Sequence, residues 1–275
     1  MPIANSFKYG IAALSVAAGA LAPTLAVAQT SQPADRWQVA ASIYAYLPTI
    51  SGTTRFPDTG GSSIDLDADT IIDSLKMAFM GSLEMHNGRW GVLNDVLYMD
   101  LGNSKSGVRD FALGGVPASV SANFDYDLKG LVWTVAGEYR LATGNPAYTI
   151  DLLAGARYFD LKQTINYSIG GTAGQFPLAG KSGTREVSGD VWDGIIGVKG
   201  RYAFGQTRQW YVPYYLDVGT GQSDLTWQAI GGVGYAFSWG ELSAMWRYLD
   251  YNFESGKAVE SMTFNGPMFG ATFRW

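Results

Sequence analysis

The sequence predicts an all-β fold, a closed antiparallel up-and-down β-barrel of about ten strands that spans a membrane. Apolar and polar residues alternate with a period of two through most of the chain. The alternating segments are joined by short and long connections in turn, which is typical of barrels that cross a membrane. Aromatic residues make up 14% of the chain and gather near the segment ends. The same pattern is compatible with eight or twelve strands.

Composition excludes several functional classes. The chain of 275 residues has no cysteine, which excludes disulfides, thiol catalysis and cysteine-ligated metals. Its one histidine, His86, excludes sites with several histidine ligands. Charged residues are 16% of the chain, below the roughly 25% of soluble domains, and the net charge of -5 argues against a nucleic-acid partner. We therefore expect a protein that is not an enzyme, with no cofactor and no metal.

The first 28 residues read as a secretory signal peptide. Lys8 supplies the positive charge, Tyr9–Ala22 is small and apolar, and Ala26-Val27-Ala28 forms an A-x-A cleavage site. This pattern predicts export through the Sec pathway with cleavage after Ala28. Residues 29–275 are then a single barrel domain, because no linker or composition shift divides them.

Ten segments carry the strand pattern, each bounded by Gly, Asn, Asp, Ser or Pro. The expected strands are Trp37–Ser51, Lys76–Met85, Trp90–Gly102, Val120–Leu141, Tyr148–Ser168, Val191–Phe204, Trp210–Val218, Asp224–Phe237, Glu241–Phe253 and Met262–Trp275. The expected short turns are 86–89, 143–146, 205–209 and 238–240. The expected longer polar loops are 52–75, 105–119, 170–188 and 254–261. One short helix is expected within the first of these loops, at Ala68–Leu75.

Alternation places charged residues on one face of the strands, which a barrel turns inward. That face holds equal numbers of acidic and basic residues, and buried charges are costly unless they are paired or hydrated. We therefore expect ion pairs that plug the interior or leave a narrow wet path. The expected interior charges are Glu84, Asp95, Glu138, Arg140, Asp151, Arg157, Asp193, Lys199, Arg201, Asp217, Arg247 and Arg274.

Aromatic residues cluster beside the short turns and the chain ends, where a barrel meets the membrane–water interface. An aromatic belt of this kind would be an aggregation hazard in water. We expect these rings to contact outer-membrane lipid and lipopolysaccharide. The expected interface residues are Trp37, Trp90, Trp210, Trp239, Trp275, Tyr139, Tyr202 and Tyr235.

The export site, the alternating strands and the terminal Phe269-Gly-Ala-Thr-Phe273-Arg-Trp275 together resemble the small outer-membrane β-barrel proteins of Gram-negative bacteria. The resemblance covers the whole mature chain. The segment from Tyr211 to Gly221 also resembles strands of the OmpW-like and OmpA-like barrels. The resemblance implies an outer-membrane location and recognition of Phe269, Phe273 and Trp275 by the barrel-assembly machinery. A terminal Trp in place of the usual Phe is a departure from that pattern.

His86 is the one histidine available as a general base. Ser82 and Glu84 share its strand face, so a Ser-His-Glu hydrolase site can be drawn. However, residues two apart on a strand lie too far from one another to relay a proton well. His86 also falls at a short turn, away from an outer-leaflet substrate. We expect a solvated turn residue there.

An acidic stretch begins with Asp65, Asp67 and Asp69, spaced as at the start of a calcium-binding loop. The pattern then fails, because Thr70 replaces the required glycine and Lys76 stands where a bidentate glutamate is needed. We expect a solvated acidic loop, continuing to Asp73, in which Asp69 caps the short helix.

Two further features concern the predicted interior. Pro213 lies in the middle of a predicted strand, where it removes a ladder hydrogen bond and predicts a local kink. Four tyrosines are expected to point inward and to pack there: Tyr44, Tyr46, Tyr211 and Tyr215.

The sequence leaves three functions open. The first is a non-enzymatic barrel with a structural or binding role in the envelope. The second is a narrow channel for ions, small polar solutes or a small apolar ligand, and the third, least supported, is an envelope lipid hydrolase. The balanced interior charge favours the first, because selective pores more often carry a ring of one sign.

Overall fold

The computed structural model describes residues 37–54, 62–113, 116–141, 145–173, 176–253 and 259–275. The predicted signal peptide and its cleavage site lie outside this part of the chain. Among the described residues, no helix is both long enough and apolar enough to cross a membrane.

The described part of the chain is almost entirely strand, as the period-two alternation predicts. The elements in chain order are β1 (Trp37–Tyr46), β2 (Thr49–Thr54), β3 (Ser62–Leu66), α1 (Ala68–Ser74), β4 (Leu75–Asn87), β5 (Trp90–Leu113), β6 (Val116–Leu141), β7 (Tyr148–Ala173), β8 (Phe176–Phe204), β9 (Trp210–Gly221), β10 (Leu225–Ala236), β11 (Glu241–Asn252) and β12 (Val259–Arg274).

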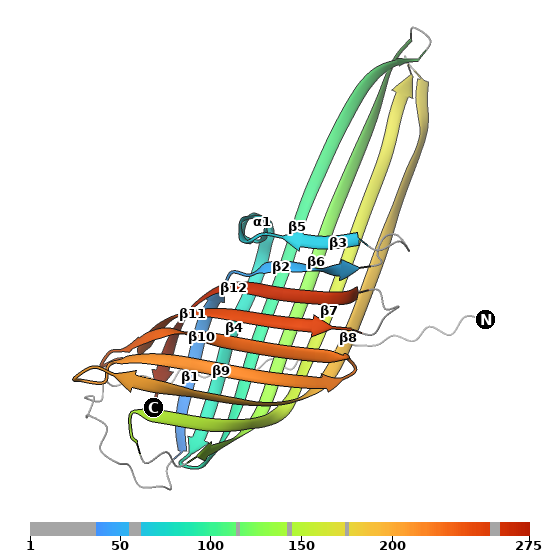
Figure 1. The fold of residues 1–275 in the computed structure, drawn as a ribbon. Coiled ribbons are helices and arrows are strands. Elements are labelled where there is room, and N and C mark those ends of the chain that lie inside the picture. Colours follow the sequence, from blue (N-terminus) through green and yellow to red (C-terminus); the bar gives the residue numbers. More distant parts are fainter. Residues whose placement is uncertain (1–36, 55–61, 114–115, 142–144, 174–175, 254–258) are drawn as a thin grey trace. The chain divides into compact units, whose positions relative to one another are not determined.

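Ten strands form one closed antiparallel ring (Figure 1). Neighbours follow the order β1, β4 and then β5 through β12, and β12 returns to pair with β1. After a break at Leu47 and Pro48, β2 continues along β12 and carries β3 as a hairpin. The predicted closed up-and-down barrel of about ten strands is confirmed. Closure removes the free edges that an open sheet would expose within the ring.

Two of the predicted polar loops are instead continuous strands. The strands β5, β6, β7 and β8 have 24, 26, 26 and 29 residues, against 12 in each of β9, β10 and β11. Residues 105–119 and 170–188 therefore belong largely to a four-stranded extension beyond the ring (Figure 1). Both faces of this extension meet solvent, so no apolar alternation marks it. Polar cross-strand pairs occur instead, such as Ser119 with Thr172 at 3.0 Å and Thr184 with Asn166 at 2.7 Å.

The predicted short helix is present as α1, but its cap is not the predicted one. Asp67 is the N-cap, and its side chain accepts a hydrogen bond from the backbone N–H of Thr70 at 2.8 Å. That bond holds the pKa of the Asp67 carboxyl below its usual value. Asp69 lies in the first turn instead, where its charge favours the helix N-terminus.

The predicted short turns at 86–89, 205–209 and 238–240 lie at the junctions between consecutive strands, as expected. Part of the fourth, 143–146, lies outside the described residues. Gly88 and Gly205 have positive φ angles of 59° and 86°, which glycine adopts without steric cost. Pro213 lies in β9, and the pairing between β9 and β10 is interrupted beside it, between Tyr211 and Tyr214. This interruption agrees with the predicted local irregularity.

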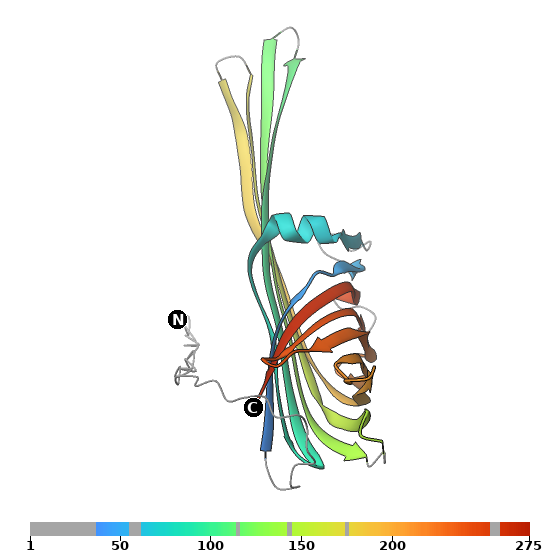
Figure 2. The same ribbon diagram turned by 90° about the vertical axis from the view of Figure 1, so that its left-hand side faces the viewer.

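The half of the interior nearer the strand extension is apolar. Figure 2 shows α1 lying across this end of the ring, and Ile71 of α1 is buried within the apolar cluster. Phe159 packs against Tyr251 and Phe253 at centroid distances of 4.7 and 5.7 Å. A cavity of about 20 Å³ lies beside Phe159, between Leu97 and Phe264 among others, with room for about one water molecule, and its apolar lining favours a dry space.

Ring closure can be tested at the β1–β12 seam. The inward-facing hydroxyls of Ser42 and Thr272 lie 2.8 Å apart on paired positions, and the chain has no native cysteine. We expect a Ser42→Cys/Thr272→Cys variant to form a disulfide in the folded state, because facing positions on paired strands meet its geometry. The measurement is gel mobility before and after reduction, with each single-cysteine variant as a control. A folded double variant that stays fully reduced under oxidising conditions would contradict the closed ring.

Candidate functional site: the charged interior

The twelve predicted interior charges lie on the inner face of the ring, and eleven of them take part in ion pairs. The twelfth, Asp193, accepts hydrogen bonds from the backbone N–H and the hydroxyl of Ser223, at 2.9 and 2.7 Å. Asp193 thereby anchors the turn between β9 and β10. The interior charges form three groups along the barrel, and Glu241 pairs with two arginines beside the first of them.

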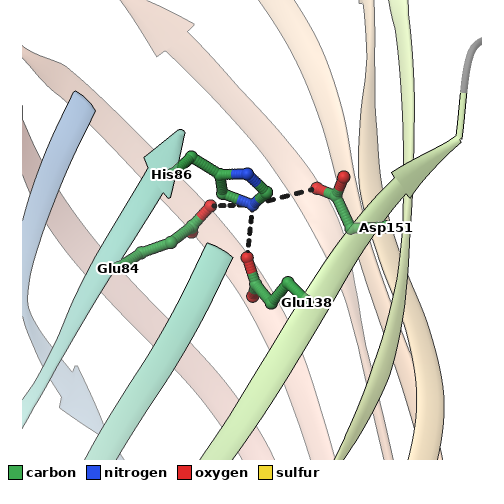
Figure 3. Close-up of side chains that lie close together, drawn as sticks. All are labelled: Glu84, His86, Glu138 and Asp151. Carbon is green, nitrogen blue, oxygen red and sulfur yellow. Dashed lines mark hydrogen bonds and ion pairs between the residues drawn. The ribbon is translucent and has the colours of Figure 1, made fainter. Parts of the chain in front are cut away.

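The first group lies beside the short turns and is called here the His86 cluster: Glu84, His86, Glu138 and Asp151 (Figure 3). The Nε2 atom of His86 lies 2.5 Å from Glu138 Oε2, 3.6 Å from Glu84 Oε1 and 3.9 Å from Asp151 Oδ2. His86 is 4% exposed, so the expectation of a solvated turn residue is wrong. His86 lies near the end of β4, where its side chain still faces the barrel interior, and its imidazole is shielded from solvent.

A glycine explains how His86 on β4 reaches Glu138 on β6. Gly91 of β5 is the register partner of both residues. A Cβ at position 91 would lie 2.6 Å from His86 Nε2 and 2.7 Å from two ring carbons. The imidazole therefore lies flat over Gly91, in space that any other residue would fill.

Two cations hold the carboxylates of the cluster: Lys199 contacts oxygens that face away from His86, whereas Arg140 also contacts Asp151 Oδ2, the oxygen that faces His86. Lys199 Nζ lies 2.6 Å from Glu84 Oε2 and 2.7 Å from Glu138 Oε1. Arg140 donates to both oxygens of Asp151, at 2.7 and 2.8 Å. Charge-assisted and bidentate bonds of this kind are strong and geometrically specific.

Next to this cluster, Glu241 joins two arginines. Its carboxylate accepts from Arg201 at 2.7 Å and from Arg274 at 3.0 and 3.2 Å. The Arg201 guanidinium also lies 4.0 Å above the Tyr211 ring. Glu241 is absent from the predicted set, although it shares the inward parity of Arg247 on the same strand.

The second and third groups cross the middle of the barrel. Arg247 contacts Asp95 at 3.2 Å, Gln228 at 2.9 Å and the Tyr44 hydroxyl at 3.1 Å. Arg157, with no exposed side-chain surface, pairs with Asp217. It also donates to Thr134 at 3.2 Å. Arg247 joins β11 to β5, and Arg157 joins β7 to β9, so each group spans strands that are not neighbours and fills interior space as well as balancing charge.

The four tyrosines predicted to point inward do so. The Tyr44 hydroxyl donates to Asp95 at 2.8 Å, and the Tyr46 hydroxyl donates to the Arg247 carbonyl at 3.1 Å. Tyr211 and Tyr215 line the same interior.

The predicted interface aromatics lie on the outer surface of the ring. Trp90 and Tyr139 pack at 4.8 Å, and Trp210 and Tyr235 at 5.0 Å. The tryptophans at the chain ends and turns are well exposed, with Trp275 at 69%. The residues of the proposed assembly signal, Phe269, Phe273 and Trp275, are exposed on the same surface.

A second group of outer aromatics escapes the sequence analysis. Trp192 packs against Trp133 at 5.9 Å and Tyr158 at 4.8 Å, and Trp227 stacks on Tyr248 at 4.6 Å. Trp133, Tyr158 and Trp192 lie inside the long strands β6, β7 and β8, so the strand ends do not reveal them, whereas Trp227 and Tyr248 lie near ends of the 12-residue strands β10 and β11.

No protein-family model matches the chain, and no curated protein matches it. Among solved structures, the chain is similar to Ail, the attachment invasion locus protein of Yersinia pestis, with 13% identity over 88% of this chain and 99% of that one, at a TM-score of 0.33. It is also similar to the translocator domain of the autotransporter NalP from Neisseria meningitidis, with 12% identity over 87% and 88% and a TM-score of 0.35. A third is the CymD monoaromatic hydrocarbon channel, with 9% identity over 88% and 89% and a TM-score of 0.29.

The buried Arg157–Asp217 pair gives a stability prediction. Arg157→Met leaves the Asp217 charge buried without its partner, and such losses cost about 3–5 kcal/mol of unfolding free energy. A double Arg157→Met/Asp217→Leu variant should recover part of that loss, because it removes both charges. The measurement is urea unfolding of the refolded barrel.

The control for this experiment is the exposed pair of Lys162 and Glu186 on the strand extension. Lys162→Met should change the unfolding free energy by less than about 1 kcal/mol. A loss of that small size for Arg157→Met would show that the interior is hydrated and not filled.

Proposed function

We propose that this chain is a non-enzymatic outer-membrane β-barrel protein, with a closed interior and a structural or binding role in the envelope. The observation that carries the proposal is the filled interior: ion pairs cross the half near the short turns, and packed apolar side chains occupy the other half. A barrel of about eight strands is just wide enough for side chains to fill, and ten strands add little room.

The outer surface supports a membrane location. Large apolar side chains are exposed around the ring, among them Ile43, Phe79, Ile196 and Leu216. A surface of this extent would be an aggregation hazard in water but suits contact with lipid. The strands β9, β10 and β11, with 12 residues each, match the 9–11 residues that a tilted strand needs to cross a bilayer. The two groups of outer aromatics suit the two interfaces.

The strand extension supports a binding role. In barrels of this class the short turns face the periplasm, which would place the extension of β5–β8 outside the cell. Its tip carries exposed apolar side chains, including Val108 at 67% and Phe176 at 78%. Rigid paired strands hold such contacts away from the membrane surface.

Conductance tests this proposal against the narrow channel. Purified protein should float with liposomes, which establishes insertion, and should give no discrete current steps in planar bilayers. Steps of reproducible size whose amplitude changes in Glu138→Ala or Arg201→Ala would overturn the closed interior and favour the channel. Failure to float with liposomes would overturn the membrane location.

A further inference from the structure

The His86 cluster has the geometry of a metal site. Its four donor atoms, one imidazole nitrogen and three carboxylate oxygens, come from β4, β6 and β7 and all lie within 4.8 Å of one another. We propose that the cluster binds one divalent transition-metal ion of the Zn²⁺ class. The proposal departs from the expectation of no metal, which rested on the single histidine of the chain.

A hydrogen bond from His86 accounts for only one of the three carboxylates that face it. One N–H at His86 Nε2 serves Glu138 Oε2 at 2.5 Å, but the facing oxygens of Glu84 and Asp151, at 3.6 and 3.9 Å, are too far to accept it. The three carboxylates converge on Nε2 of His86 (Figure 3), so a metal ion in place of that proton would have four donor atoms around it. The imidazole stays neutral as a ligand because its proton moves from Nε2 to Nδ1. His86 Nδ1 has no hydrogen-bond partner among the described residues, so no donor to Nδ1 opposes this transfer, and no protein acceptor receives the N–H that results.

The surroundings of the cluster orient its ligands. Lys199 contacts the oxygens of Glu84 and Glu138 that face away from His86, so it leaves Oε1 of Glu84 and Oε2 of Glu138 directed inward. Arg140 fixes Asp151. Outer partners of this kind orient metal ligands in known sites. Three carboxylates and these two cations carry one net negative charge when His86 is neutral, and the neighbouring group of Glu241, Arg201 and Arg274 carries one net positive charge.

The site is both built and accessible. Gly91 provides the space in which the imidazole lies, because a Cβ there would overlap the ring. The Glu84 side chain is 23% exposed while those of Glu138 and Asp151 are almost fully buried, so an ion enters past Glu84. A mixed nitrogen and oxygen donor set suits Zn²⁺ and its substitute Co²⁺, whereas Ca²⁺ and Mg²⁺ prefer oxygen alone.

The test uses the full chain, refolded in detergent and stripped with EDTA. Titration calorimetry with Zn²⁺ should show one saturable site per chain, and Co²⁺ should give visible absorption bands. Gly91→Ala keeps all four ligands but displaces the imidazole, so it should weaken Zn²⁺ binding at least tenfold and remove the Co²⁺ bands. Glu84→Gln, at the accessible edge, should also weaken binding, and it guards against misfolding of the Gly91 variant.

An Asp65→Asn/Asp69→Asn variant is the matched control, because it removes exposed carboxylates from another acidic stretch. It should bind Zn²⁺ as the wild type does. Absence of saturable binding to the wild type would overturn the proposal. So would binding that is unchanged in both Gly91→Ala and Glu84→Gln, or that is lost only in the control.

Discussion

Every predicted inward-facing charge in this barrel has an ionic or hydrogen-bonding partner on another strand or in the turn between strands. Ten strands close around an interior with little room for bulk water, where an unpaired charge is costly. Arg157 and Arg247 meet this constraint by reaching strands on other parts of the ring, to Asp217 and Asp95. The same side chains that neutralise one another also fill the space. Closure of the interior is therefore a consequence of charge pairing and needs no separate plug domain.

The interior changes character along the barrel. Ion pairs dominate beside the short turns, whereas Phe159, Tyr251 and their neighbours pack without charge near the strand extension. The helix α1 lies over this apolar end (Figure 2) and contributes Ile71 to it. A solute would have to pass both a dry apolar region and a set of buried salt bridges.

The sequence predicts the ring well because one rule, inward and outward alternation, governs it. Strand positions, inward tyrosines and the twelve interior charges all follow from parity. Parity cannot show which charges meet, so the role of Glu241 stays hidden. His86 shares the parity of Glu84, but its burial is missed because the predicted strand ends at Met85 and assigns His86 to a turn. The sequence also gives no sign of the role of Gly91, because that role is to leave space for the imidazole of His86 on the neighbouring strand. The sequence does not predict the extension of β5–β8, because strands with solvent on both faces show no alternation of apolar and polar residues.

The most direct test of the filled interior is the reactivity of a single cysteine placed at its centre. Thr226 has no exposed surface and its hydroxyl lies 3.4 Å from Arg157, and Thr226→Cys nearly conserves its volume. We expect a water-soluble thiol reagent to modify this cysteine only after unfolding, while Thr207→Cys at an exposed turn reacts at once. Rapid modification of folded Thr226→Cys would show that water fills the lumen and would contradict the account.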